Sequence, residues 1–152
     1  MKTLLCLALA LFTLTGFAQK KPNPLVTELP VTTQPSEKLR LRLFAHKYST
    51  LGSQSFAMQI KNISANPVEV KGSVVATLTN GKTKKTSFNI KLKPGESKGG
   101  DSFLLDAYGL TGEVFKEDCE GVKIQDPDDP KQTRINRIKR VGWENLVLTN
   151  PK

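Results

Sequence analysis

The chain has 152 residues, of which 38% are hydrophobic and 24% charged, with 23 Lys and Arg against 14 Asp and Glu. One domain of ordinary size fits this length, and the apolar fraction excludes a wholly disordered chain. Because the sequence holds one His, two Cys and no glycine-rich phosphate loop, most metal, triad and nucleotide chemistries lack the residues they need. The chain length also excludes a multidomain enzyme.

Residues 1–18 have the pattern of a secretory signal peptide. Lys2 precedes an apolar stretch from Leu4 to Phe12, and small residues end the segment at Ala18. The apolar stretch is shorter than the roughly 20 residues that span a bilayer, so a membrane anchor is the weaker interpretation. We expect cleavage after Ala18, a secreted or periplasmic protein, and no transmembrane segment after cleavage. The ending Gly16-Phe17-Ala18-Gln19 resembles signal peptides of Bacteroidota.

Cleavage at this position would leave a basic chain with a single cysteine. It removes Cys6 and leaves Cys119, so no intramolecular disulfide can form and stability must come from the core. We expect Cys119 to be a small buried hydrophobic residue rather than a reactive thiol, because free cysteines are usually buried. A disulfide between two chains stays open as an alternative.

Residues 19–38 are predicted to be a proline-rich disordered linker. They contain Pro22, Pro24, Pro30 and Pro35, together with Lys20 and Lys21, and no sustained apolar periodicity. Proline removes backbone donors and favours extended conformations. The short apolar stretch from Leu25 to Val31 leaves an alternative, in which this part adds an edge strand to the folded domain.

After this segment come four stretches in which apolar and polar residues alternate. This period of two is typical of half-buried strands. Asn80-Gly81 predicts a type I′ hairpin turn, and Pro94-Gly95 predicts a second turn. Asn62-Ile63-Ser64 fits a glycosylation sequon, but we interpret it as part of a turn. The residues predicted to share one face of each strand are Leu39, Leu41 and Leu43; Phe56, Met58 and Ile60; Val68, Val70, Val74, Ala76 and Leu78; and Thr86, Phe88, Ile90 and Leu92.

The remaining residues have a less regular pattern. Phe103–Leu105 and Val122–Ile124 are predicted short strands, and Tyr108–Phe115 an irregular or edge segment. Arg134–Val141 fits a helical turn as well as a bulged strand. Trp143–Leu148 is predicted to be the closing strand of the domain.

These elements predict an all-β fold, an antiparallel sandwich of about 7–8 strands over residues 39–152. No long amphipathic helix is present for parallel crossovers, which disfavours a parallel α/β fold. The run from Phe56 to Glu96, with its Asn80-Gly81 and Pro94-Gly95 turns, resembles immunoglobulin-like or fibronectin type III-like bacterial sandwich domains. The buried Trp and paired cysteines of true immunoglobulin domains are absent from their usual places. The resemblance implies a fold and no particular function.

Residues for catalysis or metal binding are sparse. A pair of Cys119 and His46 would need a third group to orient the imidazole, and no spacing supports a triad. Asp126, Asp128 and Asp129 could bind Ca²⁺ through oxygen ligands, but the loop lacks the glycine and closing glutamate of an EF-hand. With prolines between these acids, a rigid solvated turn is the preferred interpretation. We expect no enzymatic activity, no metal and no cofactor.

Basic residues provide the candidate binding feature. Five occur within residues 131–140, and our candidate anion-binding residues are Arg134, Arg137, Lys139 and Arg140. If Ile135, Ile138 and Val141 face the core, these bases form a solvated face instead. Nucleic acid is disfavoured because aromatic residues for base stacking are scarce. A second group of lysines from Lys82 to Lys98 suits protection of a sheet edge from aggregation.

We therefore expect a non-catalytic exported module that binds or scaffolds at the cell envelope. The first hypothesis is adhesion or protein–protein interaction through an exposed sheet edge or loops, with binding that tolerates salt. The second is electrostatic binding of anionic glycans or lipid headgroups through the basic residues, with affinity that falls steeply with salt. A hydrolase or enzyme inhibitor is a third alternative that no motif supports. The oligomeric state stays open.

Overall fold

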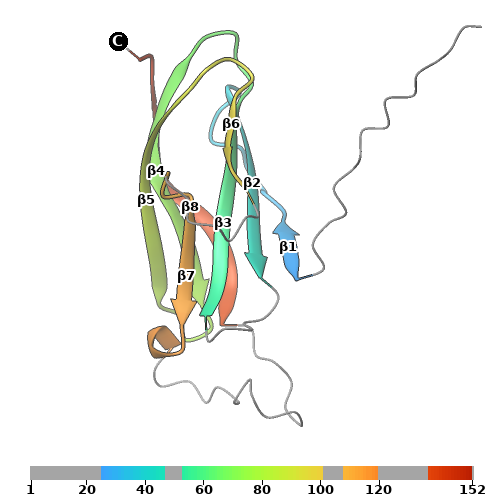
Figure 1. The fold of residues 1–152 in the computed structure, drawn as a ribbon, viewed down its shortest axis with the longest axis vertical. Helices are drawn as coiled ribbons and strands as arrows, with labels where there is room; N and C mark the ends of the chain where they lie inside the picture. The colour runs from blue at the N-terminus through green and yellow to red at the C-terminus, as the bar shows by residue number, and fades with distance from the viewer. Residues whose placement is uncertain (1–24, 47–52, 101–107, 120–136, 152) are drawn as a thin grey trace, which may run out of the picture.

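Two antiparallel sheets pack face to face in the computed structural model of the protein, which describes residues 25–46, 53–100, 108–119 and 137–151 (Figure 1). The predicted all-β antiparallel sandwich is confirmed. The first sheet contains β1 (Val26–Leu29), β2 (Leu39–His46), β3 (Ser53–Asn62), β6 (Ser97–Gly99) and β7 (Thr111–Phe115). The second contains β5 (Thr83–Leu92), β4 (Val68–Leu78) and β8 (Ile138–Thr149), in that order.

The first sheet has two central strands, β2 and β3, and the second has one, β4. In the first sheet β2 pairs with β1 and β3, and the other edge of β3 is shared, because β6 pairs with Gln59–Lys61 and β7 with Ser53–Ala57. In the second sheet β4 pairs with β5 on one side and β8 on the other. Among the described strands, β8 is therefore the edge of the second sheet opposite β5.

The core lies between the two sheets and is filled by the alternating apolar residues. In β2 the three leucines from Leu39 to Leu43 are buried while Arg40 and Arg42 are exposed, as the period of two predicts. In β3 the core residues are Phe56, Met58 and Ile60. β4 and β5 supply the core residues that face them from the other sheet. Burying each large aliphatic or aromatic side chain contributes about 1.5–3 kcal/mol. The alternation of apolar and polar residues therefore puts on one face of each strand the side chains whose burial holds the two sheets together.

The β4–β5 hairpin forms where Asn80-Gly81 predicts it, but its turn is not type I′. Gly81 has a φ of +84°, whereas Asn80 is not among the residues with positive φ, which a type I′ turn requires. Leu78 N–H donates to Lys82 O at 2.8 Å, and Gly81 N–H donates to Leu78 O at 3.0 Å. This is a three-residue loop with a bulge at glycine. The Asn80 side chain stabilises it by accepting a hydrogen bond from Lys82 N–H at 3.0 Å.

The turn at Pro94-Gly95 is confirmed and follows β5. Glu96 N–H donates to Lys93 O at 3.0 Å, and Gly95 has a φ of +75°. Proline followed by a glycine with positive φ is the signature of a type II turn. Immediately after it comes the short strand β6, which no local pattern predicts.

Asn62 organises the same end of the sandwich. Its side chain is fully buried, and its Nδ2 donates to the backbone oxygens of Asn66, Leu92 and Lys93 at 2.8, 3.3 and 3.2 Å. Its Oδ1 accepts from Ser64 N–H at 2.9 Å. The turn interpretation of Asn62-Ile63-Ser64 is confirmed, since the Asn62 side chain bonds to the backbone of the connection between β3 and β4.

The folded sandwich begins earlier in the chain than Leu39. Val26–Leu29 forms β1 and pairs antiparallel with β2, so the linker predicted over residues 19–38 is wrong for this part and the edge-strand alternative holds. Leu29 packs against the core, and Glu28 forms an ion pair with Arg42 at 2.5 Å. These contacts outweigh the extended preference of the flanking prolines.

Several predicted features lie outside the described residues. They are the signal segment 1–18, the strands Phe103–Leu105 and Val122–Ile124, and the acidic turn Asp126–Asp129. Within the described part of the chain, the one helical element is the 3₁₀ turn η1 (Glu117–Cys119), and no helix there has the length and apolar character needed to cross a bilayer.

Candidate functional site

The four candidate anion-binding residues do not form one exposed cluster. Arg134 lies outside the described residues. Arg137 directly precedes β8 and is 2% exposed, with its carbonyl accepting a hydrogen bond from Thr79 N–H at 2.9 Å. Lys139 and Arg140 are exposed on β8. The anion-binding surface that the structure describes is therefore reduced to this pair.

The segment around this pair is a bulged strand and not a helical turn. Arg140 pairs with Thr77 and Ile138 pairs with Leu78, so Lys139 is an extra residue in the ladder. Ile138 and Val141 face the core as expected, but the buried Arg137 departs from the simple division into an apolar face and a basic face. Strand geometry with a bulge accounts for two successive exposed bases, because the extra residue breaks the alternation.

A second bulge interrupts β8 farther along. Its register shifts between Lys71 and Ser73 of β4, opposite Asn145, which has a φ of +53°. The stretch from Arg140 to Glu144, between the two bulges, keeps a regular antiparallel register with β4. Bulges bend a strand and interrupt its regular pairing. The stretch between the two bulges is therefore the part of β8 near Lys139 and Arg140 that pairs regularly.

The free edge of that stretch can be assigned from the hairpin. Both backbone groups of Leu78 point toward β5, because they bond with Lys82 and Gly81. Antiparallel pairing alternates, so every second residue of β4 from Thr77 back to Ser73 points its groups toward β8. The partners of those residues on β8 are Arg140, Gly142 and Glu144. The N–H and C=O groups of Val141 and Trp143 therefore point away from β4, toward an edge that no described strand covers.

A groove of about 430 Å³ lies along this edge. One wall is the end of β1 with the segment after it, and the other wall is the start of β8. Its volume falls in the usual range of ligand-binding clefts. The residues that line it are Leu29, Pro30, Val31, Thr32, Thr33, Leu43, Lys139, Arg140, Val141, Gly142 and Trp143.

The groove combines an apolar base with a positive rim. Leu43 and Val141 are buried, and Trp143, the one tryptophan of the chain, is partly buried against the core. Lys139 and Arg140 are the charged residues in the lining, and neither forms an ion pair within the described chain. The groove is therefore positively charged.

The acidic residues next to the groove are already engaged elsewhere. Glu28 precedes the wall residue Leu29 and pairs with Arg42, while Glu144 follows Trp143 and pairs with Lys85 at 2.5 Å. Hydrogen bonds from Arg42 lower the pKa of Glu28. These two carboxylates are held by their own partners and leave the groove's positive charge in place.

A larger hollow, of about 750 Å³, lies on the other side of the segment that follows β1. Its charged lining includes Arg40 and the Glu28–Arg42 pair, with hydrogen bonds of 2.7 and 2.5 Å from the guanidinium to the carboxylate. Arg42 also lies 5.4 Å from the centre of the Phe44 ring. Because most of its charge is paired internally, this hollow is the weaker candidate for binding a charged ligand.

Cys119 and His46 lie at the end of the sandwich where β7 leads into η1. The Cys119 side chain is 1% exposed, which confirms the predicted burial. Burial raises the pKa of its thiol, against the opposing influence of Arg137 and of a hydrogen bond with Thr79. Burial lowers the pKa of His46. A protonated, inaccessible thiol is a poor nucleophile.

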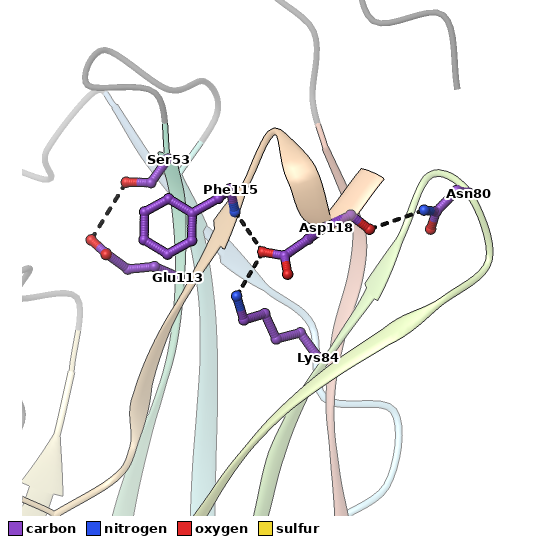
Figure 2. Close-up of polar contacts among 6 residues, drawn as sticks. All are labelled: Ser53, Asn80, Lys84, Glu113, Phe115 and Asp118. Atoms are coloured by element: carbon purple, nitrogen blue, oxygen red, sulfur yellow. Dashed lines mark hydrogen bonds and ion pairs between the residues drawn. The ribbon is translucent and has the colours of Figure 1, made fainter. Parts of the chain in front are cut away.

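Polar contacts connect η1 with β7 of the first sheet and with β5 of the second (Figure 2). The Asp118 carboxylate accepts hydrogen bonds from Phe115 N–H at 2.7 Å and from Lys84 Nζ at 2.6 Å. Asn80 Nδ2 donates to Asp118 O at 3.1 Å, and Lys84 Nζ lies 5.0 Å from the centre of the Phe115 ring. These groups satisfy one another, so the cluster fixes the end of the sandwich. In the described residues no three His, Cys, Asp or Glu side chains gather as a possible metal site.

Sequence reasoning found part of the groove and missed the rest. Lys139 and Arg140 were identifiable as part of a basic run, and the nearby Trp143 was a signal of a binding surface. The opposite wall, residues 29–33, overlaps the short apolar stretch that ends at Val31, but that stretch predicts an edge strand and gives no sign of a groove. No family model matches the chain, and neither the curated proteins nor the solved structures contain a match.

Proposed function

We propose that the protein is a non-catalytic, exported binding module that captures a partner protein along the edge of β8. The proposal extends to an immunoglobulin-like or fibronectin type III-like affiliation, supported by the strand and turn pattern from Phe56 to Glu96. An exported address at the cell envelope is supported by the signal-like residues 1–18. Such sandwiches often bind through strand edges and loops while the core serves only as a scaffold.

The groove beside an uncovered strand edge is the observation that carries this proposal. Val141 and Trp143 offer backbone donors and acceptors, and the buried Leu43 and Val141 offer apolar surface next to them. A strand of a partner can satisfy the backbone groups while its side chains fill the groove. Both kinds of contact favour a polypeptide ligand over a small ion.

Electrostatic binding of anionic glycans or lipid headgroups is the weaker alternative. It depended on four bases acting together, and burial of Arg137 removes one of them from the surface. The exposed pair Lys139 and Arg140 supplies too little charge for strong binding to a polyanion, since each exposed ion pair contributes only about 0.2–1 kcal/mol.

A pull-down from envelope extract tests the proposal with a variant that obstructs the groove. Thr32 lines the groove and is exposed, so Thr32→Tyr adds a bulky side chain at the groove without disturbing the core. Asn89→Tyr makes the same kind of change at an exposed position on β5 and is the matched control.

We expect the wild-type protein and Asn89→Tyr to retain the same partner protein, identified by mass spectrometry, at low and high salt. Thr32→Tyr should retain roughly tenfold less, as expected when a bulky side chain obstructs an interface. Equal capture by all three proteins would refute a site at the groove. Capture of glycan or lipid alone, released by salt, would refute the protein partner and favour the electrostatic alternative.

A further inference from the structure

We infer that the groove takes an extended, acidic segment of the partner, which adds a strand to β8 while its carboxylates pair with Lys139 and Arg140. This inference rests on the proposed function, because it names the chemical class of the captured segment. Three properties of the groove specify that class: the outward backbone groups, the apolar base and the unbalanced positive charge.

The backbone of β8 specifies an extended and short segment. Val141 and Trp143 each present an N–H and a C=O to the open edge, which is the spacing that an added antiparallel or parallel strand requires. The bulge at Lys139 begins the regular stretch, and the bulge near Asn145 ends it. At about 3.3 Å per residue, this stretch accommodates pairing with roughly five residues.

The lining specifies side chains on one face of that segment. Successive side chains of a strand point to opposite faces, so alternate residues of the ligand face the groove. Leu43 and Val141 form an apolar base there, and Trp143 adds an aromatic wall. An apolar side chain at the centre of the bound segment would be buried against these three residues.

The positive charges of the groove specify acidic residues on either side of that apolar side chain in the bound segment. Lys139 and Arg140 are exposed at the rim without a described ion-pair partner, and the lining contains no Asp or Glu. The adjacent Glu28 and Glu144 are occupied by Arg42 and Lys85. Charge complementarity therefore favours a ligand with carboxylates and disfavours a basic one.

Trp143 provides the readout for a direct test. It is the one tryptophan of the chain and lies in the groove, so its fluorescence reports occupancy of this site. The probes are two synthetic heptapeptides, one alternating Glu with Val and one alternating Lys with Val. A third probe is the acidic peptide with alternate backbone amides N-methylated, which removes its donors on one edge.

We expect the acidic peptide to shift the Trp143 emission saturably. The lysine peptide should bind at least about tenfold more weakly than the acidic peptide. The N-methylated peptide, with its blocked edge facing β8, should also bind at least about tenfold more weakly than the acidic peptide. Changing Lys139→Glu together with Arg140→Glu should reverse the preference between the acidic and basic peptides. Lys91→Glu together with Lys93→Glu changes the net charge equally, at exposed positions outside the groove, and should leave the preference unchanged.

The outcomes separate this inference from the proposed function. Equal binding of the acidic and lysine peptides, or an unchanged preference in the Lys139/Arg140 double variant, overturns the acidic class while capture at the groove stands. The acidic class is also overturned if neither peptide changes Trp143 emission while Thr32→Tyr still weakens capture of the partner. If Thr32→Tyr captures the partner normally, the proposed function itself fails.

Discussion

Gln54 joins the two sheets through one fully buried side chain. Its Nε2 donates to His46 O at the end of β2, at 2.6 Å, and its Oε1 accepts from Ile138 N–H at the start of β8, at 2.8 Å. Because Ile138 begins the strand that lines the groove, this amide sets where β8 enters the second sheet. A single polar residue in the core thus positions the binding edge.

Replacing Gln54 by leucine should destabilise the protein strongly. Gln54→Leu removes the acceptor of the buried Ile138 N–H and a donor to the partly buried His46 C=O, at about 1–3 kcal/mol for each lost bond, so we expect a loss of about 2–4 kcal/mol. Urea unfolding followed by Trp143 fluorescence measures it. The control is Gln59→Leu, at a partly exposed position of the same strand, where we expect a loss below about 1 kcal/mol. Similar losses in both variants would contradict the assigned role.

Asp118 makes the end of the sandwich sensitive to acid. Partial burial works to raise the pKa of Asp118, but hydrogen bonds from Lys84 Nζ and Phe115 N–H outweigh burial, and the net pKa is lowered below 3.8. The folded state therefore favours the carboxylate more than the unfolded state does. The resulting stability is fully present above the unfolded pKa and is lost as pH falls through the folded pKa.

We expect the free energy of unfolding to fall as the pH drops below about 4, with part of this loss due to Asp118. In Asp118→Asn that part should vanish, so its stability should change less between pH 5 and pH 2.5. Chemical denaturation at a series of pH values measures the difference. Glu37→Gln alters an exposed carboxylate outside any described ion pair and should keep the wild-type slope; a wild-type slope in Asp118→Asn would disprove the assignment.

The bulge near Asn145 in β8 and the regular stretch before it differ in the space that their neighbouring glycines leave. The bulge faces Gly72 on β4, where an added Cβ would lie 2.6 Å from Leu146 Cδ2 and 3.2 Å from Glu144 O. An alanine here would therefore force the Leu146 side chain to move and press on the backbone of the bulge. At Gly142 of the regular stretch, in contrast, the space around a Cβ is open.

These two glycines predict opposite responses to the same substitution. Gly72→Ala should destabilise the protein by about 1–3 kcal/mol, because the core side of the bulge is overpacked. Gly142→Ala should stay within about 0.5 kcal/mol of wild type, because a strand surface tolerates alanine. Paired urea denaturation curves provide the comparison. Equal effects at both positions would show that the bulge is not packed as described.

The strands with the clearest alternation were predictable, while elements fixed by distant partners were not. Leu39–Leu43 and Phe56–Ile60 follow the period of two because burial of one sheet face decides both. The position of the hairpin was predictable from Asn80-Gly81, but its turn type was not, since Asn80 also bonds to Asp118 from another element. β1 was the less favoured alternative because prolines flank it and its partner β2 is separated from it in the chain.

At the scale of the whole molecule, the sandwich brings together two distant segments to make the groove. Residues 29–33 and 139–143 have no sequence pattern in common, and only the packing of the two sheets places them side by side. The basic run predicted two of the groove residues, Lys139 and Arg140. It could not reveal that Arg137 is buried, because burial at that position depends on how β8 joins the core.

Amide hydrogen exchange along β8, resolved by residue with NMR, tests the central claim most directly. In the free protein, the amides of Val141 and Trp143 should exchange at least about tenfold faster than those of Arg140, Gly142 and Glu144, which bond to β4. Addition of the captured partner should slow Val141 and Trp143 to the rates of their neighbours. Uniform protection in the free protein, or unchanged exchange of these two amides in the complex, would contradict an open β8 edge as the binding surface.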